Sequence, residues 1–180
     1  MALLNVLTFP HPLLAQPSQP VTEFDEALKT LSKDMLETMY DEHGIGLAAP
    51  QVGQLRQMIV VDVREGEAEE EGERPEGALR PRNPRVYVNP VIEAQSGEVV
   101  TEEGCLSVIE FTAEVKRAEQ ITLAYQTLTG EKKREELSGL AAVCVQHEID
   151  HLQGKLFIDH LPPLKRQMVR KKLAKLARSA

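Results

Sequence analysis

The chain has 180 residues, of which 42% are hydrophobic and 27% charged, a composition typical of one globular domain of ordinary size. This excludes collagen-like, coiled-coil and wholly disordered chains, and no apolar run approaches the roughly 18 residues that a membrane span needs. The net charge of −7 is unevenly spread, because residues 164–180 carry seven basic side chains and no acidic one. The first basic residue is Lys29, so the charged start of a signal peptide is missing and we expect a cytoplasmic protein.

The N-terminal part of the chain predicts one helix and one strand. Thr22 and Asp25 resemble a capping box, and apolar residues then recur every three or four positions until about residue 43. The Gly-Ile-Gly stretch at 44–46 is predicted to be a loop, and the β-branched run 58–63 a strand. The glutamate-rich residues 65–84 have too little apolar surface to order themselves, so we expect an acidic insertion loop there.

The second half of the chain predicts strands and then helices. The predicted strands cover 85–89, 97–101, 121–127 and 131–137, with a hairpin turn between the last two. Helices are predicted over 139–154, capped by Ser138, and over 163–178, which begins with a proline. Helices at both ends and hairpin-linked strands between them indicate the α+β class. We expect antiparallel β-sheets packed around the central helix, with an N-terminal helix and a C-terminal helix beside them.

Residues 146–151, Gln-His-Glu-Ile-Asp-His, carry the most informative pattern. His147 and His151 lie four positions apart on one face of the predicted helix, so both imidazoles can hold one metal ion. Glu148 follows the first histidine, where its carboxylate can take a proton from water beside that ion. The alternative is a pair of half-buried histidines satisfied by hydrogen bonds, which the intervening glutamate disfavours.

A catalytic metal site of this kind needs a third protein ligand and one open position. Downstream of the helix only Asp159 and His160 could ligate, and neither stands at a recognised spacing. Cys105 follows a glycine at a turn or strand edge and is the better candidate, because a thiolate suits zinc or ferrous iron. Cys105 as a buried structural cysteine is the alternative, and Cys144, on an apolar helix face, is assigned to packing.

Three segments together resemble the signature motifs of peptide deformylases, in the same order. They are Gly-Ile-Gly-Leu-Ala-Ala-Pro-Gln at 44–51, Glu-Gly-Cys-Leu-Ser at 103–107 and the histidine motif at 146–151. The resemblance extends over nearly the whole chain. It implies an enzyme that removes the formyl group from the N-terminal formylmethionine of nascent bacterial polypeptides and releases formate. It also implies a single catalytic metallohydrolase domain over 1–163, followed by a basic C-terminal helix over 164–180.

The resemblance also implies roles for individual residues. It assigns one divalent metal ion per chain to Cys105, His147 and His151. Glu148 would serve as general base and acid when water activated by the metal attacks the formyl carbon. The Gln51 side chain and the Leu106 backbone N–H would stabilise the resulting oxyanion. The residues implied to bind substrate are Gly44, Ile45, Gly46, Gly104, Val143 and Cys144.

The identity of the metal rests on the resemblance alone. The family implies Fe²⁺, with Zn²⁺ or Ni²⁺ as substitutes in isolated protein, whereas the order of affinities by itself favours zinc over iron. Two positions depart from the family's usual pattern: Ile109 stands where a proline is usual, and 111–112 where an arginine is often found. Preferences beyond the first substrate residue therefore stay open.

The basic residues 164–180 have two interpretations. Their apolar stripe predicts a helix packed on the body of the protein, and their charge predicts docking on a polyanion, either ribosomal RNA or a membrane surface. The family resemblance implies the ribosome as that partner. We expect no DNA partner and no membrane span.

Other functions stay open from the residues alone. A peptidase or amidase of the same metal-helix class would cleave internal peptide bonds. A non-catalytic metal-sensing module, associated with the ribosome, would use a closed four-ligand site with His160 as the fourth ligand. A redox role for Cys105 and Cys144 lacks a Cys-x-x-Cys spacing, and a reducing compartment disfavours a disulfide between them.

Overall fold

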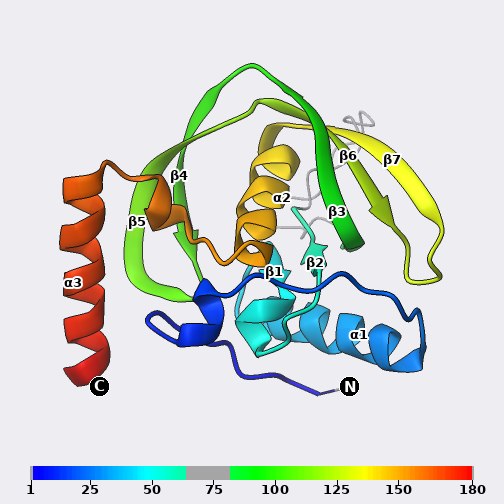
Figure 1. The fold of residues 1–180 in the computed structure, drawn as a ribbon, viewed down its shortest axis with the longest axis horizontal. Helices are drawn as coiled ribbons and strands as arrows, with labels where there is room; N and C mark the ends of the chain where they lie inside the picture. The colour runs from blue at the N-terminus through cyan, green and yellow to red at the C-terminus, as the bar shows by residue number, and fades with distance from the viewer. Residues whose placement is uncertain (1, 64–81, 180) are drawn as a thin grey trace, which may run out of the picture.

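The computed structural model describes residues 2–63 and 82–179, and it contains helices, short 3-10 helices (η) and strands (Figure 1). In chain order these are η1 (Pro12–Ala15), α1 (Glu26–Asp41), β1 (Gly46–Ala48), η2 (Ala49–Val52), β2 (Met58–Val61), β3 (Arg85–Ser96), β4 (Val99–Cys105), β5 (Val108–Arg117), β6 (Gln120–Gln126), β7 (Lys132–Ser138), α2 (Gly139–Leu152), η3 (Phe157–His160) and α3 (Pro163–Ser179). This combination of helices with antiparallel strands confirms the α+β class. Within the described ranges no helix is long and apolar enough to cross a bilayer.

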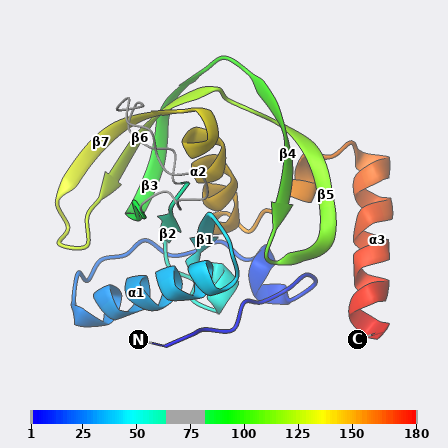
Figure 2. The ribbon, with the colours of Figure 1, turned by 180° about the vertical axis from the view of Figure 1, so that it is seen from behind.

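The strands form two sheets on opposite sides of helix α2. One sheet has five antiparallel strands in the order β1-β2-β3-β6-β7, and the other is the two-stranded β4–β5 hairpin. The chain passes from one sheet to the other twice, from β3 to β4 and back from β5 to β6. Figures 1 and 2 show these two long strand pairs arching over α2, which lies between the sheets. Helix α2 is therefore covered on both sides, and ten of its 14 residues are buried.

Three apolar clusters hold this arrangement together. The first joins α2 to the five-stranded sheet through residues such as Val145, Ile149, Ile59 and Leu123. The second packs the apolar face of α1 against β1 and β2. The third packs the β4–β5 hairpin on η3, and Val169 and Leu173 of α3 are buried in the same cluster. Figure 1 shows α3 standing at the edge of the molecule beside β5. The division of the chain into a domain ending at 163 and an appended helix stays a prediction.

Several element boundaries differ from those that the sequence predicts. Helix α1 begins at Glu26, because the Asp25 carboxylate accepts a hydrogen bond from the backbone N–H of Leu28, 3.0 Å away, and caps the helix there. Gly46 is not in a loop: it starts strand β1 and pairs with Val61 of β2. Ser138 occupies the N-cap position of α2, but its side chain makes no capping hydrogen bond.

The strands in the second half of the chain are longer and more numerous than the sequence predicts. Strand β5 was not predicted, β3 continues beyond its predicted end to Ser96 in the arch over α2, and β4 continues beyond its predicted end to Cys105, away from the arch. The predicted β6–β7 hairpin is confirmed, with Ile121 opposite Leu137. The predicted acidic insertion lies outside the described residues except for 82–84, which lead into β3.

Candidate active site

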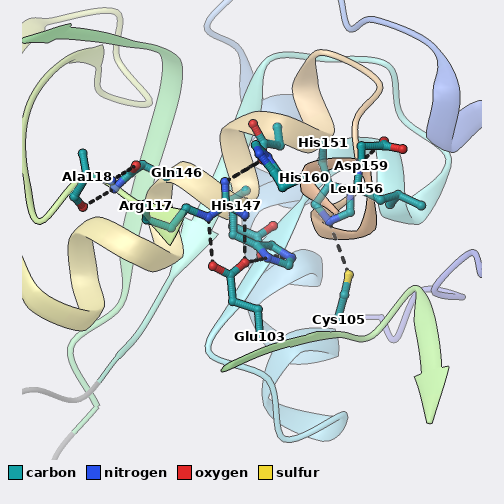
Figure 3. A network of polar contacts seen from close by, with 12 residues as sticks. Glu103, Cys105, Arg117, Ala118, Gln146, His147, His151, Leu156, Asp159 and His160 are labelled. Atoms are coloured by element: carbon teal, nitrogen blue, oxygen red, sulfur yellow. Dashed lines mark hydrogen bonds and ion pairs between the residues drawn. The ribbon is translucent and has the colours of Figure 1, made fainter. Parts of the chain in front are cut away.

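One sulfur and two imidazoles meet between α2 and the β4–β5 hairpin. A ligand atom from each of Cys105, His147 and His151 lies within 4.8 Å of the other two. The Cys105 Sγ is 3.4 Å from the His151 Nε2, and the two histidine ring centroids are 5.2 Å apart (Figure 3). A divalent ion about 2.0–2.3 Å from a sulfur and two nitrogens needs donors with separations of this order, so the three side chains fit a single ion.

The backbone around Cys105 explains how its sulfur comes to face the histidines. The pairing of β4 with β5 shifts register between Glu103 and Cys105, which pair with Ala113 and Val108. Such an irregularity re-aims a side chain at the end of a ladder. The sulfur also receives a long contact from the backbone N–H of Ser107, at 3.4 Å. The thiolate is the form of cysteine that binds a metal.

Glu103 orients the first histidine. Its Oε1 accepts a hydrogen bond from the Nδ1 of His147 at 2.9 Å, and Arg117 holds the same carboxylate. In the neutral form that binds a metal, this contact keeps the ring proton on Nδ1 and leaves Nε2 as the ligand atom. Burial disfavours the imidazolium, but hydrogen bonds to Cys105 and Glu103 outweigh burial and raise the pKa of His147. Burial likewise opposes ionisation of Glu103, yet its hydrogen bonds from Arg117 and His147 lower its pKa.

The second histidine has a different environment. His151 is almost fully buried, and burial together with the nearby charge of His147 lowers its pKa to about 3. Its imidazole is therefore neutral at ordinary pH. Because a metal displaces protons from its ligands, a histidine that is already neutral has none to lose on binding.

Glu148 lies beside the three ligand atoms. Its Oε1 is 3.9 Å from the Nε2 of His147, and its Oε2 is buried without a hydrogen-bond partner among the described residues. Burial raises its pKa to about 7, a value suited to a group that accepts and returns a proton near neutral pH. Gly46 leaves the space for this carboxylate: a Cβ there would lie 2.9 Å from Glu148 Oε1 and 2.7 Å from the Sγ of Cys144.

Gln51 approaches the same centre from η2. Its Oε1 accepts a hydrogen bond from the backbone N–H of Ala48 at 2.9 Å, which fixes the orientation of the amide. Its Nε2 then donates to the hydroxyl of Ser107 at 3.0 Å and points at the sulfur of Cys105, 3.5 Å away. Gln51 is only 1% exposed, so its amide is buried beside Cys105 and Ser107. Leu106 stands in the turn between Cys105 and Ser107.

The other residues implied to bind substrate form two groups, one beside Cys144 of α2 and one beside the β4–β5 hairpin. Ile45 is 43% exposed, and its carbonyl oxygen lies 3.7 Å from the thiol of Cys144, which burial keeps at a raised pKa. Val143 precedes Cys144 on α2 and is also buried. Gly44 lies against the Leu106 side chain, whereas Gly104 faces Thr112 of β5. The structure thus brings Gly46, Cys144 and Glu148 together, and the contacts of these residues with substrate stay predictions.

The structure does not support the alternative metal ligands or the disulfide that the sequence left open. His160 contacts Asp150 at 2.7 Å and is not in the ligand cluster. Asp159 accepts a hydrogen bond from the backbone N–H of Leu156 and pairs with Arg170, so it is not a ligand either. Cys105 and Cys144 are free thiols rather than a disulfide.

Sequence reasoning missed the supporting polar residues. Glu103 and Asp150 lie within the motifs at 103–107 and 146–151, but the sequence analysis gives them no role. Their positions next to the predicted ligands could have marked them as supporting residues. Arg117 stands in no local pattern. Ser107 ends its motif, and only the fold reveals that its hydroxyl meets Gln51.

Comparison with known proteins gives a consistent result. Residues 3–167 match the family described as polypeptide deformylase. The peptide deformylase of Pseudoalteromonas translucida is 49% identical over 180 residues, which cover 100% of this chain and 99% of that protein. The solved peptide deformylase of Legionella pneumophila superimposes with a TM-score of 0.83 at 42% identity, covering 98% of this chain and 96% of that chain. The peptide deformylase of Ehrlichia chaffeensis, solved in complex with actinonin, matches with a TM-score of 0.83 at 35% identity, over 97% and 98% of the two chains.

Proposed function

The chain belongs to the peptide deformylase family and is a deformylase enzyme, and we propose that it hydrolyses the formyl group of N-terminal formylmethionine on nascent polypeptides. In this reaction water forms a bond to the formyl carbon, the carbon–nitrogen bond breaks, and formate and a free amine are released. The observation that carries the proposal is the meeting of Cys105, His147 and His151 beside the buried carboxylate of Glu148.

We assign the metal to the Sγ of Cys105 and to one ring nitrogen each of His147 and His151. The mixed sulfur and nitrogen donors, their close approach and the fixed tautomer of His147 fit a divalent transition-metal ion. When bound, such an ion supplies Lewis acidity, which lowers the pKa of water and polarises a carbonyl oxygen. Ferrous iron is the ion that the family resemblance implies, and the same donors accept Zn²⁺ or Ni²⁺.

Glu148 carries the proton in this mechanism. Its carboxylate takes a proton from the attacking water and delivers it to the methionine nitrogen as the carbon–nitrogen bond breaks. A leaving amine needs that proton, because an amide nitrogen departs poorly as an anion. The burial that raises the pKa of Glu148 to about 7 supports both halves of the task, since the group binds and releases a proton with little cost.

Gln51 and the backbone N–H of Leu106 stabilise the negative oxygen that forms on the formyl carbon. A donor fixed in advance contributes about 3 kcal/mol to such a transition state. Gln51 meets this condition, because Ala48 holds its oxygen and Ser107 holds its nitrogen. A carboxamide also donates without a protonation equilibrium of its own.

The substrate backbone lies along 44–46 in this proposal, and the methionine side chain enters a pocket lined by Ile45, Gly104, Val143 and Cys144. Two features support the placement. Ile45 is exposed at the edge of the sheet. The absent side chain at Gly46 keeps the approach to Glu148 open.

We also propose that the enzyme works in the cytoplasm and docks on ribosomal RNA through α3. Its two free thiols suit a reducing compartment. Leu164 and Met168 of α3 are 72% and 65% exposed and stand among basic side chains. The charge-reversed variant Lys171→Glu, Lys172→Glu should lose salt-sensitive co-sedimentation with ribosomes while keeping its melting temperature. Unchanged co-sedimentation would leave α3 as a helix that only packs on the body.

The reaction is tested by comparing three peptides: a formylmethionyl peptide, its unformylated counterpart and an internally cleavable peptide of similar composition. The proposal predicts stoichiometric release of formate and a free amine from the first peptide and no cleavage of the other two. Cleavage of internal peptide bonds without formate would instead identify a peptidase.

A further inference from the structure

Behind the first histidine ligand lies a buried network of charged side chains (Figure 3). Glu103 receives three hydrogen bonds: its Oε1 accepts from His147 Nδ1 at 2.9 Å and from Arg117 Nη2 at 2.8 Å, and its Oε2 accepts from Arg117 Nε at 2.8 Å. The Arg117–Glu103 pair is thus bidentate, the geometry in which a guanidinium holds a carboxylate in one orientation. The orientation of the His147 ring therefore depends on a carboxylate that Arg117 holds.

The network continues from Arg117 to a second carboxylate. Arg117 Nη1 donates to Asp150 Oδ2 at 2.7 Å, and the same oxygen accepts from His160 Nε2 at 2.7 Å. Asp150 stands between the two histidine ligands in the sequence, yet it turns away from them to Arg117. The path from His147 to His160 thus joins four elements: α2, β4, β5 and η3.

Gln146 and Ala118, the chain neighbours of His147 and Arg117, also connect α2 to the end of β5. Gln146 precedes His147, and its side chain closes a ring with Ala118: Oε1 accepts from the Ala118 N–H at 3.0 Å and Nε2 donates to the Ala118 oxygen at 2.9 Å. Arg117, the last residue of β5, therefore hydrogen-bonds Asp150 of α2, and Ala118, which follows it, hydrogen-bonds Gln146. Both contacts act on the one helical turn that presents His147.

The burial of these charges argues that the network does more than hold the fold together. The side chains of Glu103 and Arg117 are 6% and 4% exposed, so both charges have lost most of their hydration. A buried ion pair is often no more stabilising than apolar residues of the same volume. Such a pair can nevertheless fix the geometry of a neighbouring ligand, since the orientation and basicity of a metal-bound imidazole depend on the partner of its other nitrogen.

We propose that Arg117, Asp150 and His160 are positioning residues for the metal ligand His147. Arg117 holds Glu103, Asp150 holds Arg117, and His160 satisfies the outer side of Asp150, so that His147 keeps its Nδ1 proton and its ring orientation. This inference rests on the proposed ligation of the metal by His147. It predicts that these three residues set the affinity for the metal although none of them touches it.

The test measures Zn²⁺ affinity on the demetallated full-length protein by competition with a chelator. Asp150→Asn keeps the shape of the side chain and removes its charge, and Arg117→Lys keeps the charge and loses the fork. Each should raise the Kd for Zn²⁺ by about tenfold or more, the effect typical of residues that support a metal-bound histidine. His160→Gln changes a partly exposed group and should raise the Kd less. The visible absorption spectrum of the Co²⁺-loaded variants should shift, because it reports ligand geometry.

Control variants separate this role from loss of stability. Leu28→Val weakens the distant α1 cluster, and Arg134→Gln breaks the exposed pair of Arg134 with Glu93 on the five-stranded sheet. Both should leave the Kd and the Co²⁺ spectrum unchanged. If Asp150→Asn and Arg117→Lys lower only the melting temperature and keep the wild-type Kd and spectrum, the inference is wrong. His147→Ala tests the premise: wild-type Zn²⁺ affinity in that variant would refute the proposed ligation, and with it the inference.

Discussion

Helix α2 has two faces that meet opposite kinds of surroundings. Toward the five-stranded sheet it presents apolar side chains, among them Val145 and Ile149, which join the first core cluster. Toward the β4–β5 hairpin it presents His147, Asp150 and His151, which meet a thiol, a carboxylate and a guanidinium. Burial of the apolar face stabilises the fold by roughly 25 cal/mol for each Å² removed from water, whereas desolvation of the charged face costs free energy.

This difference between the two faces explains how the fold holds charged groups between two sheets. The apolar face fixes the helix against the larger sheet, and the side chains on its other face are held by the hydrogen bonds they make to the hairpin. We therefore expect stability to depend mainly on the apolar face, and metal binding with proton transfer to depend on the other. Substitutions on the two faces should separate these properties.

The largest effect is expected from removing a metal ligand. Cys105→Ala leaves two imidazoles for an ion that needs three protein donors, so the variant should lose stoichiometric metal and reduce formate release to background. Its circular dichroism should stay that of the wild type, because the sheet-facing side of α2 is intact. Metal analysis and formate release on the same sample check this expectation. One bound ion per chain with normal turnover would contradict it.

The next effect concerns proton transfer without loss of the metal. Glu148→Gln keeps the size and burial of the side chain but cannot accept a proton, so kcat should fall by about 10²–10⁴-fold. Metal content should stay at the wild-type level, since Glu148 is not among the three ligands. A nearly silent substitution would favour a non-catalytic, metal-sensing module.

Gln51→Ala should give a comparable or smaller loss, confined to the chemical step. Removing one oxyanion donor lowers kcat by about 10²–10³-fold, while KM and the metal content change little. Ser107→Ala should have a smaller effect in the same direction, because Ala48 still holds the amide oxygen of Gln51. The exposed neighbour Gln54→Ala is the matched control. Equal kcat values for the Gln51 and Gln54 variants would remove Gln51 from the mechanism.

The smallest effect is expected on the apolar face. Ile149→Val deletes one methylene next to the sheet and should lower the free energy of unfolding by about 0.5–1.5 kcal/mol. The Kd for Zn²⁺ and the kcat should stay unchanged, in contrast to Asp150→Asn on the adjacent position. Chemical denaturation together with chelator competition checks both halves. A weakened metal affinity in Ile149→Val would mean that the two faces are not separable.

Much of this site follows from the sequence, because its most informative contacts are local. His147 and His151 share a face through helical spacing alone, Cys105 follows as the best remaining ligand by its chemistry, and the family motifs add Gln51 by resemblance. The order of helices and hairpins was also accessible from periodicity and turn residues.

The missing parts depend on contacts between distant segments. Arg117 meets Glu103 across the β4–β5 hairpin and Asp150 from another element, 33 positions along the chain, and no periodic pattern records either contact. Strand β5 is the exception: its buried Ala113 and Val115 alternate with exposed polar or charged residues, the period-two pattern of a half-buried strand, so the sequence already carried a signal for it. The start of α1 was misplaced because Thr22 and Asp25 are both acceptable caps, and the contact with Leu28 decides between them.

X-ray absorption at the metal edge of the Zn²⁺-loaded protein tests the central claim most directly. We predict one sulfur at about 2.3 Å and nitrogen or oxygen donors at about 2.0–2.1 Å, with the sulfur lost in Cys105→Ala. A first shell that contains no sulfur in the wild-type protein would contradict it.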